Sequence, residues 1–294
     1  MTEMKLFLRF IHKSFLLILV VLVGCPTTPD TLLNQGIKHL NKGQYDKAIL
    51  DFTKAIEINP SAEAYYRRGI AYTDKAFFLF SKAIEIEIKD QMLAAGYYRS
   101  KDDYADKAFS DLNKAIELNP KYAEAYESRG RAYYNKEQYD KAIADLNEAI
   151  ELNPMYGEAY FFRGIAYFSR AVPFDRSNAE VWKAIYDKSM ADFNKAIEVN
   201  PEYPKTYEFR GLFYIFMGQS DKAKADWNKA MEKYYLRASS YKAKGQDMKA
   251  CLDYGIACGL GSDAACDEYD MLKEKVPCTR RIIINKMRSN RFIQ

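Results

Sequence analysis

Apolar residues recur along much of this chain at the spacing of an amphipathic α-helix, and residues 123–156 show the pattern most clearly. The positions that recur in this stretch are Tyr126, Gly130 and Tyr133 in its first half and Ala142, Leu146, Ala149 and Leu152 in its second half. Asn153-Pro154 follows and ends the second helix, because the residue before a proline is disfavoured in the α region. The pattern predicts two helices joined by a short turn.

Two sequence markers indicate that this helix pair is repeated along the chain. A Lys-Ala-Ile-Glu run, or a close variant of it, begins in the second helix at Lys54, Lys82, Lys114, Glu148, Lys195 and Lys229. A glycine recurs in the first helix at Gly36, Gly69, Gly96, Gly130, Gly164 and Gly211. Both markers predict six units, which are 29–61, 62–88, 89–122, 123–156, 157–203 and 204–235. The second unit is shortened at its inter-helix turn, between Tyr72 and Asp74, and the fifth carries an insertion, 171–183.

The recurring glycines also indicate how the helices pack. A glycine inside a helix costs about 1 kcal/mol relative to alanine, so its recurrence in one register predicts a close approach of two helices. The order of small and large residues in 123–156 resembles the tetratricopeptide repeat. That resemblance implies an all-α fold, an α-solenoid of stacked antiparallel helix pairs that winds into a right-handed superhelix. A single pair has too little core to fold alone, so neighbouring pairs stack.

The charge of the chain is unevenly distributed. The formal net charge is +4, with +2 in residues 1–24, about −3 in 25–275 and +5 in the tail 276–294. The repeat array is therefore mildly acidic, and we expect no nucleic-acid partner for it. The basic tail could contact anionic lipid or an acidic partner, although such tails are more often solvated.

The first 24 residues predict a secretory signal, since Lys5, Arg9 and Lys13 precede an apolar run from Phe15 to Val23. A permanent membrane span is the weaker interpretation, because nine helical residues reach about 14 Å and the hydrocarbon core is about 30 Å thick.

The residues 22–25, Leu-Val-Gly-Cys, resemble the lipobox of bacterial lipoproteins. The resemblance implies that Cys25 is the first mature residue, acylated by fatty acids such as palmitate, with 25–28 as a short tether. The location it implies is the bacterial cell envelope, facing the periplasm or associated with the outer membrane. A chance cysteine after an ordinary signal peptide is the alternative.

The family resemblance also assigns residues to a concave, partner-binding groove. These are Tyr66, Tyr97, Tyr134, Phe161, Phe162, Ile165, Phe168, Phe209, Leu212 and Ile215. Chaperone-binding members place basic residues where this chain has Glu63, Glu124 and Glu158, so we do not expect it to clamp a peptide's terminal carboxylate. An apolar groove suits an extended or helical apolar segment of a protein partner. Burial of some of these side chains under the insertion 171–183 is the equally weighted alternative.

Opposite charges recur regularly in the two helices of the units. The arginines are Arg68, Arg129, Arg163 and Arg210, and the acids are Asp51, Asp111, Asp145, Asp192 and Asp226. The pattern predicts Arg–carboxylate pairs between packed helices. A row of anion-binding arginines is disfavoured, because the acids would neutralise it.

The chain changes pattern after the sixth unit. Residues 253–261, with Ala265-Cys266, resemble the Sel1-like repeat, which implies a disulfide between Cys258 and Cys266. Residues 236–275 then form this unit together with a capping helix. Cys251 and Cys278 remain as a possible second pair, which an oxidising compartment would permit. A metal site is the weaker alternative, since the spacing fits no zinc pattern.

Candidate catalytic chemistry is sparse. Only His39 remains after removal of the signal, so a Ser-His-Asp or Cys-His arrangement is not expected. We predict no enzyme activity, no cofactor, no metal and no small-molecule substrate. The sequence favours a lipid-anchored envelope scaffold for protein or peptide partners, in secretion, pilus or cell-wall assembly. The alternatives are a self-associating structural protein of the envelope and a cell-wall-binding protein or enzyme; the oligomeric state stays open.

Overall fold

The computed structural model describes residues 28–87, 91–171 and 179–276. The predicted signal 1–24, Cys25, Cys278, the tail from 277 onward and residues 172–178 of the insertion lie outside these ranges. The described residues form helices and no strand. The helices are α2 (Pro29–Asn41), α3 (Tyr45–Ile58), α4 (Ala62–Glu87), α5 (Gln91–Leu118), α6 (Ala123–Asn135), α7 (Tyr139–Leu152), α8 (Gly157–Ala171), α9 (Ala179–Val199), α10 (Pro204–Phe216), α11 (Ser220–Ala243), α12 (Asp247–Gly259) and α13 (Asp263–Lys273).

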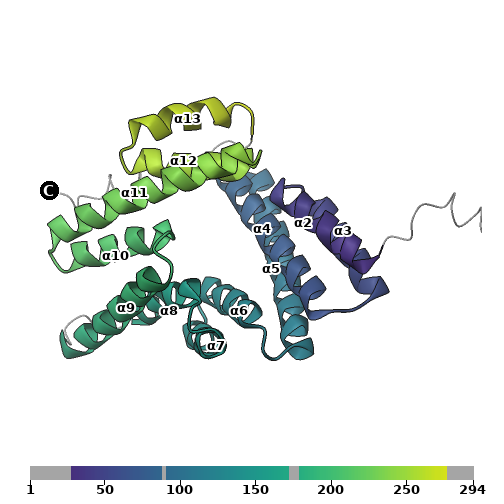
Figure 1. Cartoon of the computed structure of the whole chain (residues 1–294), viewed down its shortest axis with the longest axis horizontal. Helices are drawn as coiled ribbons and strands as arrows, with labels where there is room; N and C mark the ends of the chain where they lie inside the picture. The colour runs from purple at the N-terminus through teal and green to yellow at the C-terminus, as the bar shows by residue number, and fades with distance from the viewer. Residues whose placement is uncertain (1–27, 88–90, 172–178, 277–294) are drawn as a thin grey trace, which may run out of the picture.

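Helices that are consecutive in the chain pack against each other in pairs. The pairs are α2 with α3, α4 with α5, α6 with α7, α8 with α9, α10 with α11, and α11 with α12, on which α13 packs in turn. The pairs follow one another along a curved path (Figure 1). This arrangement confirms the predicted all-α solenoid of stacked helix pairs. None of the described helices is both long and apolar enough to cross a membrane.

Asn-Pro dipeptides decide where one pair ends and the next begins. Asn59 and Asn153 end α3 and α7 with a non-helical backbone, and a proline follows each of them. The sequence after Met231 has no such dipeptide, and α11 continues through to Ala243. The predicted unit boundary at 235/236 is therefore wrong, because it falls inside one helix. α11 serves as the second helix of one pair and the first helix of the next.

The predicted units 62–88 and 89–122 are not separate helix pairs, which is a second correction. α4 and α5 are single long helices that pack against each other. In the regular pairs a residue with positive φ opens the turn, such as Gly43 at 69° or Gly218 at 70°. α4 has Thr73-Asp74-Lys75 in the corresponding stretch, and with no such residue the helix continues. The two predicted units are one repeat whose helices extend into a hairpin.

One turn uses a residue that tolerates positive φ poorly. Glu137 has φ 59° in the turn between α6 and α7, whereas the turns after α2, α10, α11 and α12 place glycine at positive φ. The left-handed conformation costs an L-residue with a side chain about 1 kcal/mol, so we expect Glu137→Gly to raise the free energy of unfolding by about that amount. Urea denaturation measures the change. The neighbouring Lys136→Gly, at negative φ, is the control and should not stabilise the protein; equal gains in both variants would contradict the prediction.

The recurring glycines mostly lie where two helices touch. A Cβ added to Gly130 would lie 2.9 Å from Leu146 Cγ and 3.2 Å from the carbonyl oxygen of Ala142. Gly96 differs, since nothing lies within 4 Å of its added Cβ. The packing prediction is therefore wrong for Gly96, which belongs to the α4–α5 hairpin extension.

The curvature of the array brings its last pair back beside its first (Figure 1). The Tyr45 hydroxyl donates to Met248 Sδ at 3.7 Å, and Lys249 Nζ donates to Asn41 Oδ1 at 3.3 Å. Asp74 of α4 also interacts electrostatically with Lys249 of α12. These contacts join the α2–α3 turn and α4 to the start of α12. Residues from distant repeats therefore face one another across the inside of the curve.

Candidate functional site

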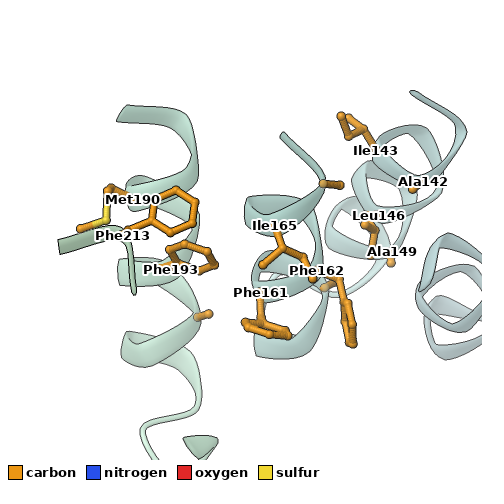
Figure 2. Close-up of a cluster of buried hydrophobic side chains, with 13 residues drawn as sticks. Ala142, Ile143, Leu146, Ala149, Phe161, Phe162, Ile165, Met190, Phe193 and Phe213 are labelled. Carbon is orange, nitrogen blue, oxygen red and sulfur yellow. The ribbon is translucent and has the colours of Figure 1, made fainter. Parts of the chain in front are cut away.

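Three of the residues predicted to line an apolar groove belong to the hydrophobic core instead. Phe161, Phe162 and Ile165 are 1%, 7% and 5% exposed. Figure 2 shows them on α8, in one cluster with Leu146 of α7 and Phe193 of α9. The groove prediction is wrong for these three, because the face of α8 that carries them packs between neighbouring helices. Tertiary packing of this kind cannot be seen in the helical period alone.

The other predicted groove residues keep part of their surface accessible. They are Tyr66, Tyr97, Tyr134, Phe168, Phe209, Leu212 and Ile215. Tyr66 lies against Tyr122, with ring centroids 4.9 Å apart, and Phe168 lies 4.6 Å from Phe213. Tyr97 lies in the hairpin extension on α5.

A polar cluster on the inside of the curve offers a better candidate for a binding site. We call it the inner cluster. It consists of Asp74 on α4, Glu127 and Arg131 on α6, Glu158 on α8 and Tyr203 at the start of α10. Arg131 interacts electrostatically with each of the other four, although they come from four different helices or their ends. Of these residues, only Glu158 was assigned to the groove from sequence.

Glu127 is the most buried member of the inner cluster, with 2% of its surface exposed. Its Oε2 accepts hydrogen bonds from the Tyr156 hydroxyl and the Ser128 hydroxyl, both at 3.2 Å. Its Oε1 is buried and has no hydrogen-bond partner among the described residues. Burial raises the pKa of the Glu127 carboxyl, Glu158 adds to the rise, and Arg131 opposes it. The site therefore holds a carboxyl group whose charge is poorly compensated.

Arg131 is half-buried, and its guanidinium lies 5.6 Å from the centre of the Phe162 ring. Burial alone would lower the pKa of this guanidinium, but Glu127 and Asp74 hold it above its usual value. No carboxylate of the described residues lies within 4.0 Å of it to form an ion pair. Burial also raises the pKa of Asp74. The inner cluster thus contains three acids, Asp74, Glu127 and Glu158, none of which forms an ion pair with Arg131.

The arginines of the regular ladder differ from Arg131 because each is paired. Their bidentate carboxylate partners are Asp111 for Arg68, Asp145 for Arg129, Asp192 for Arg163 and Asp226 for Arg210. Arg129 also donates from Nη1 to Asn113 Oδ1 at 3.0 Å, so one guanidinium links three helices. These contacts confirm the predicted pairs between packed helices, and we call this set the Arg–Asp ladder.

Two further contacts extend the Arg–Asp ladder to both ends of the array. Arg237 of α11 pairs with Asp253 of α12 at 2.6 Å and 2.9 Å, and this pair is not among those predicted from sequence. Arg237 and Asp253 are 16 residues apart, as are Arg129 and Asp145. This repeated spacing could have predicted the pair. In the first unit Gln35 stands before the glycine where other units have arginine, and His39 contacts the aspartate instead, with Nδ1 2.7 Å from Asp51 Oδ2.

The cysteines of the C-terminal unit are bonded. Cys258 at the end of α12 and Cys266 in α13 form a disulfide across the turn between these helices. Cys251 is fully buried and disulfide-bonded, and the partner predicted for it, Cys278, is outside the described ranges. Within those ranges no three His, Cys, Asp or Glu side chains form a group that could hold a metal ion.

Models of a known repeat match three segments of the chain. Residues 29–61 and 112–144 match models described as tetratricopeptide repeat, and residues 130–170 match one described as TPR repeat. The helix pairs, the glycine contacts and the Arg–Asp ladder define the class of protein, a stacked α-solenoid. Over residues 29–61 and 112–170 this solenoid is similar to the tetratricopeptide repeat.

Several solved structures are similar to the chain. A crystal structure of MamA is 26% identical, with a TM-score of 0.45, and the match covers 69% of this chain and 96% of that one. A tetratricopeptide repeat protein from Parabacteroides merdae ATCC 43184 is 22% identical, with a TM-score of 0.49 and coverage of 85% and 86%. MamA from Desulfovibrio magneticus RS-1 is 17% identical, with a TM-score of 0.46 and coverage of 70% and 94%. No curated protein matches the chain.

Proposed function

We propose that this protein is a lipid-anchored scaffold of the bacterial cell envelope that binds a partner protein on the inside of its curved array. The observation that carries the proposal is the inner cluster, where Arg131 is unpaired among the described residues and Glu127 lacks a partner for one oxygen. A folded protein rarely leaves buried polar groups unpaired. The Arg–Asp ladder satisfies its own charges. Four buried side-chain atoms of the described residues lack a partner, and Glu127 Oε1 is the one among them that belongs to an ionisable group; the others are Ser189 Oγ, Thr206 Oγ1 and Gln219 Oε1.

The sequence supports the anchoring part of the proposal. The lipobox-like residues 22–25 place Cys25 where acylation is expected, and two or more acyl chains would hold the protein stably on a membrane. The short tether 25–28 would keep the array close to that membrane. We also assign the pair of α12 and α13 to the Sel1-like type, on its sequence and on the disulfide that joins these helices. Secretion, pilus assembly and cell-wall assembly are the processes in which we expect such an adaptor.

In-cell crosslinking tests the proposal directly. With the full chain as bait, we expect one dominant envelope protein to be captured, and Cys25→Ala should move the bait out of the membrane fraction. Glu127→Gln should abolish the capture, because it removes the buried carboxylate of the inner cluster whose Oε1 lacks a partner. The matched control is Glu151→Gln, which changes an exposed glutamate of α7 and should leave the capture intact.

Other outcomes of the same experiment would overturn the proposal. Crosslinks between copies of the bait alone would favour a self-associating structural protein. Capture that is equally strong in Glu127→Gln and in the parent would remove the inner cluster from the binding surface. A bait that stays in the membrane fraction after Cys25→Ala would contradict the lipid anchor.

A further inference from the structure

We infer that the inner cluster binds a lysine or arginine side chain of the partner, which Glu127 accepts on its free carboxylate oxygen. The inference rests on the proposed function and specifies the chemistry of the partner segment. It follows from three features of the inner cluster, which are its unmet hydrogen bond, its excess of acids and its tyrosines.

The unmet hydrogen bond fixes the kind of group that must enter. Glu127 Oε1 is the one carboxylate oxygen among the buried side-chain atoms of the described residues that lack a partner. In the Arg–Asp ladder, by contrast, both oxygens of Asp145 accept hydrogen bonds from Arg129 at 2.7 Å. A carboxylate oxygen only accepts, so the missing group is a donor. Hydrogen bonds from a charged donor to a carboxylate are about twice as strong as neutral ones.

The balance of charge favours a cation over an anion. Asp74, Glu127 and Glu158 outnumber the two cations that interact with them, Arg131 and Lys249. An acidic group that approached Arg131 would meet the field of all three carboxylates. A basic group would be attracted by the three acids and repelled by two cations, and it would also satisfy Glu127 Oε1.

The tyrosines around Glu127 suit the same ligand. Tyr66, Tyr156 and Tyr203 all lie within electrostatic range of its carboxyl. Aromatic rings attract lysine and arginine cations, and the long aliphatic stems of these side chains pack well on apolar surface. The three tyrosines come from separate repeats along the curve, so we expect the cation to project from an extended segment of a partner protein.

Selection from a random peptide library tests this inference. The mature full chain is panned against displayed 12-residue peptides, in parallel with Glu127→Gln. We expect the parent to recover peptides enriched in lysine or arginine at one position, and Glu127→Gln to recover peptides without that enrichment. Glu151→Gln, which alters an exposed glutamate of α7, is the matched control and should behave as the parent.

The recovered peptides then give a quantitative test. Replacing the enriched lysine by norleucine should weaken binding to the parent by about tenfold or more, and it should change binding to Glu127→Gln far less. Equal losses for the two proteins would overturn the contact with Glu127.

The possible failures of this experiment can be told apart. Peptides recovered without any basic bias would overturn the inference and leave the scaffold proposal standing. No recovered peptide at all, together with no captured partner in cells, would overturn both. The same selection is repeated with a variant in which the five basic residues of the chain's own tail are changed to alanine. If only this variant recovered peptides enriched in basic residues, the tail would be the occupant of the inner cluster, and the inferred partner contact would be overturned.

Discussion

We expect Asp145→Ala to lower the free energy of unfolding by about 3 kcal/mol, because removal of one partner strands a largely buried charge. Asp145 accepts hydrogen bonds from Arg129 Nε and Nη2, both at 2.7 Å, and the side chains are 10% and 19% exposed. The variant leaves the Arg129 guanidinium with the Asn113 side chain as its remaining hydrogen-bond partner among the described residues. Since this rung of the Arg–Asp ladder lies in the middle of the array, its loss also weakens the interface between neighbouring repeats.

Urea denaturation followed by circular dichroism measures this effect, and an exposed ion pair provides the control. Lys136 Nζ lies 2.6 Å from Asp106 Oδ1, but these side chains are 40% and 70% exposed. Exposed pairs contribute about 0.5 kcal/mol, so Asp106→Ala should leave the unfolding midpoint almost unchanged. If Asp145→Ala destabilised the protein no more than Asp106→Ala, the Arg–Asp ladder would not be a structural element.

The Arg–Asp ladder could be predicted from sequence because its arginines and aspartates recur at the same positions of successive repeats. Arg129 and Arg210 each lie 16 residues before their aspartates, and a repeated spacing identifies a repeated contact. The inner cluster has no such spacing. Asp74, Arg131 and Tyr203 come from different repeats, and only the curvature of the whole array brings them within range of one another. Curvature is the sum of many small packing angles, and no local sequence pattern encodes it.

The wrong predictions have a similar origin. The Lys-Ala-Ile-Glu run at Lys82 and the glycine at Gly96 are repeat markers, yet both lie on the continuous helices of the α4–α5 hairpin. A marker reports the local helix and not the presence of a turn, which depends on residues such as Gly43 and Gly218 that adopt positive φ. Phe161 shows the same limit of a local pattern. The helical period predicts on which face of the helix it lies, but it does not show that neighbouring helices bury that face.

The second large effect concerns the pH dependence of stability and its origin in Glu127. Burial raises the pKa of this carboxyl above the usual glutamate value of 4.5. Between 4.5 and the raised value, the folded protein therefore holds more protons at Glu127 than the unfolded chain does. Stability contributed by this group is fully present below the usual pKa and is lost as pH rises through the raised one. Asp74 and Asp192, whose pKa values burial also raises, add to the same trend.

We expect Glu127→Gln to remove this contribution and to raise the free energy of unfolding at pH 7.5 by about 2 kcal/mol, since a buried carboxylate with one unsatisfied oxygen is costly. At pH 4 the gain should largely disappear, because Glu127 is then protonated in the parent as well. Urea denaturation of both proteins from pH 4 to pH 8 gives the difference between their free energies of unfolding. Asp74 and Asp192 are present in both proteins, so their contributions cancel in this difference. Glu124→Gln should show no pH-dependent gain, and a loss of stability in Glu127→Gln at pH 7.5 would contradict the prediction. A substitution that stabilises the free protein while it abolishes partner binding would mark Glu127 as a residue kept for binding at the expense of stability.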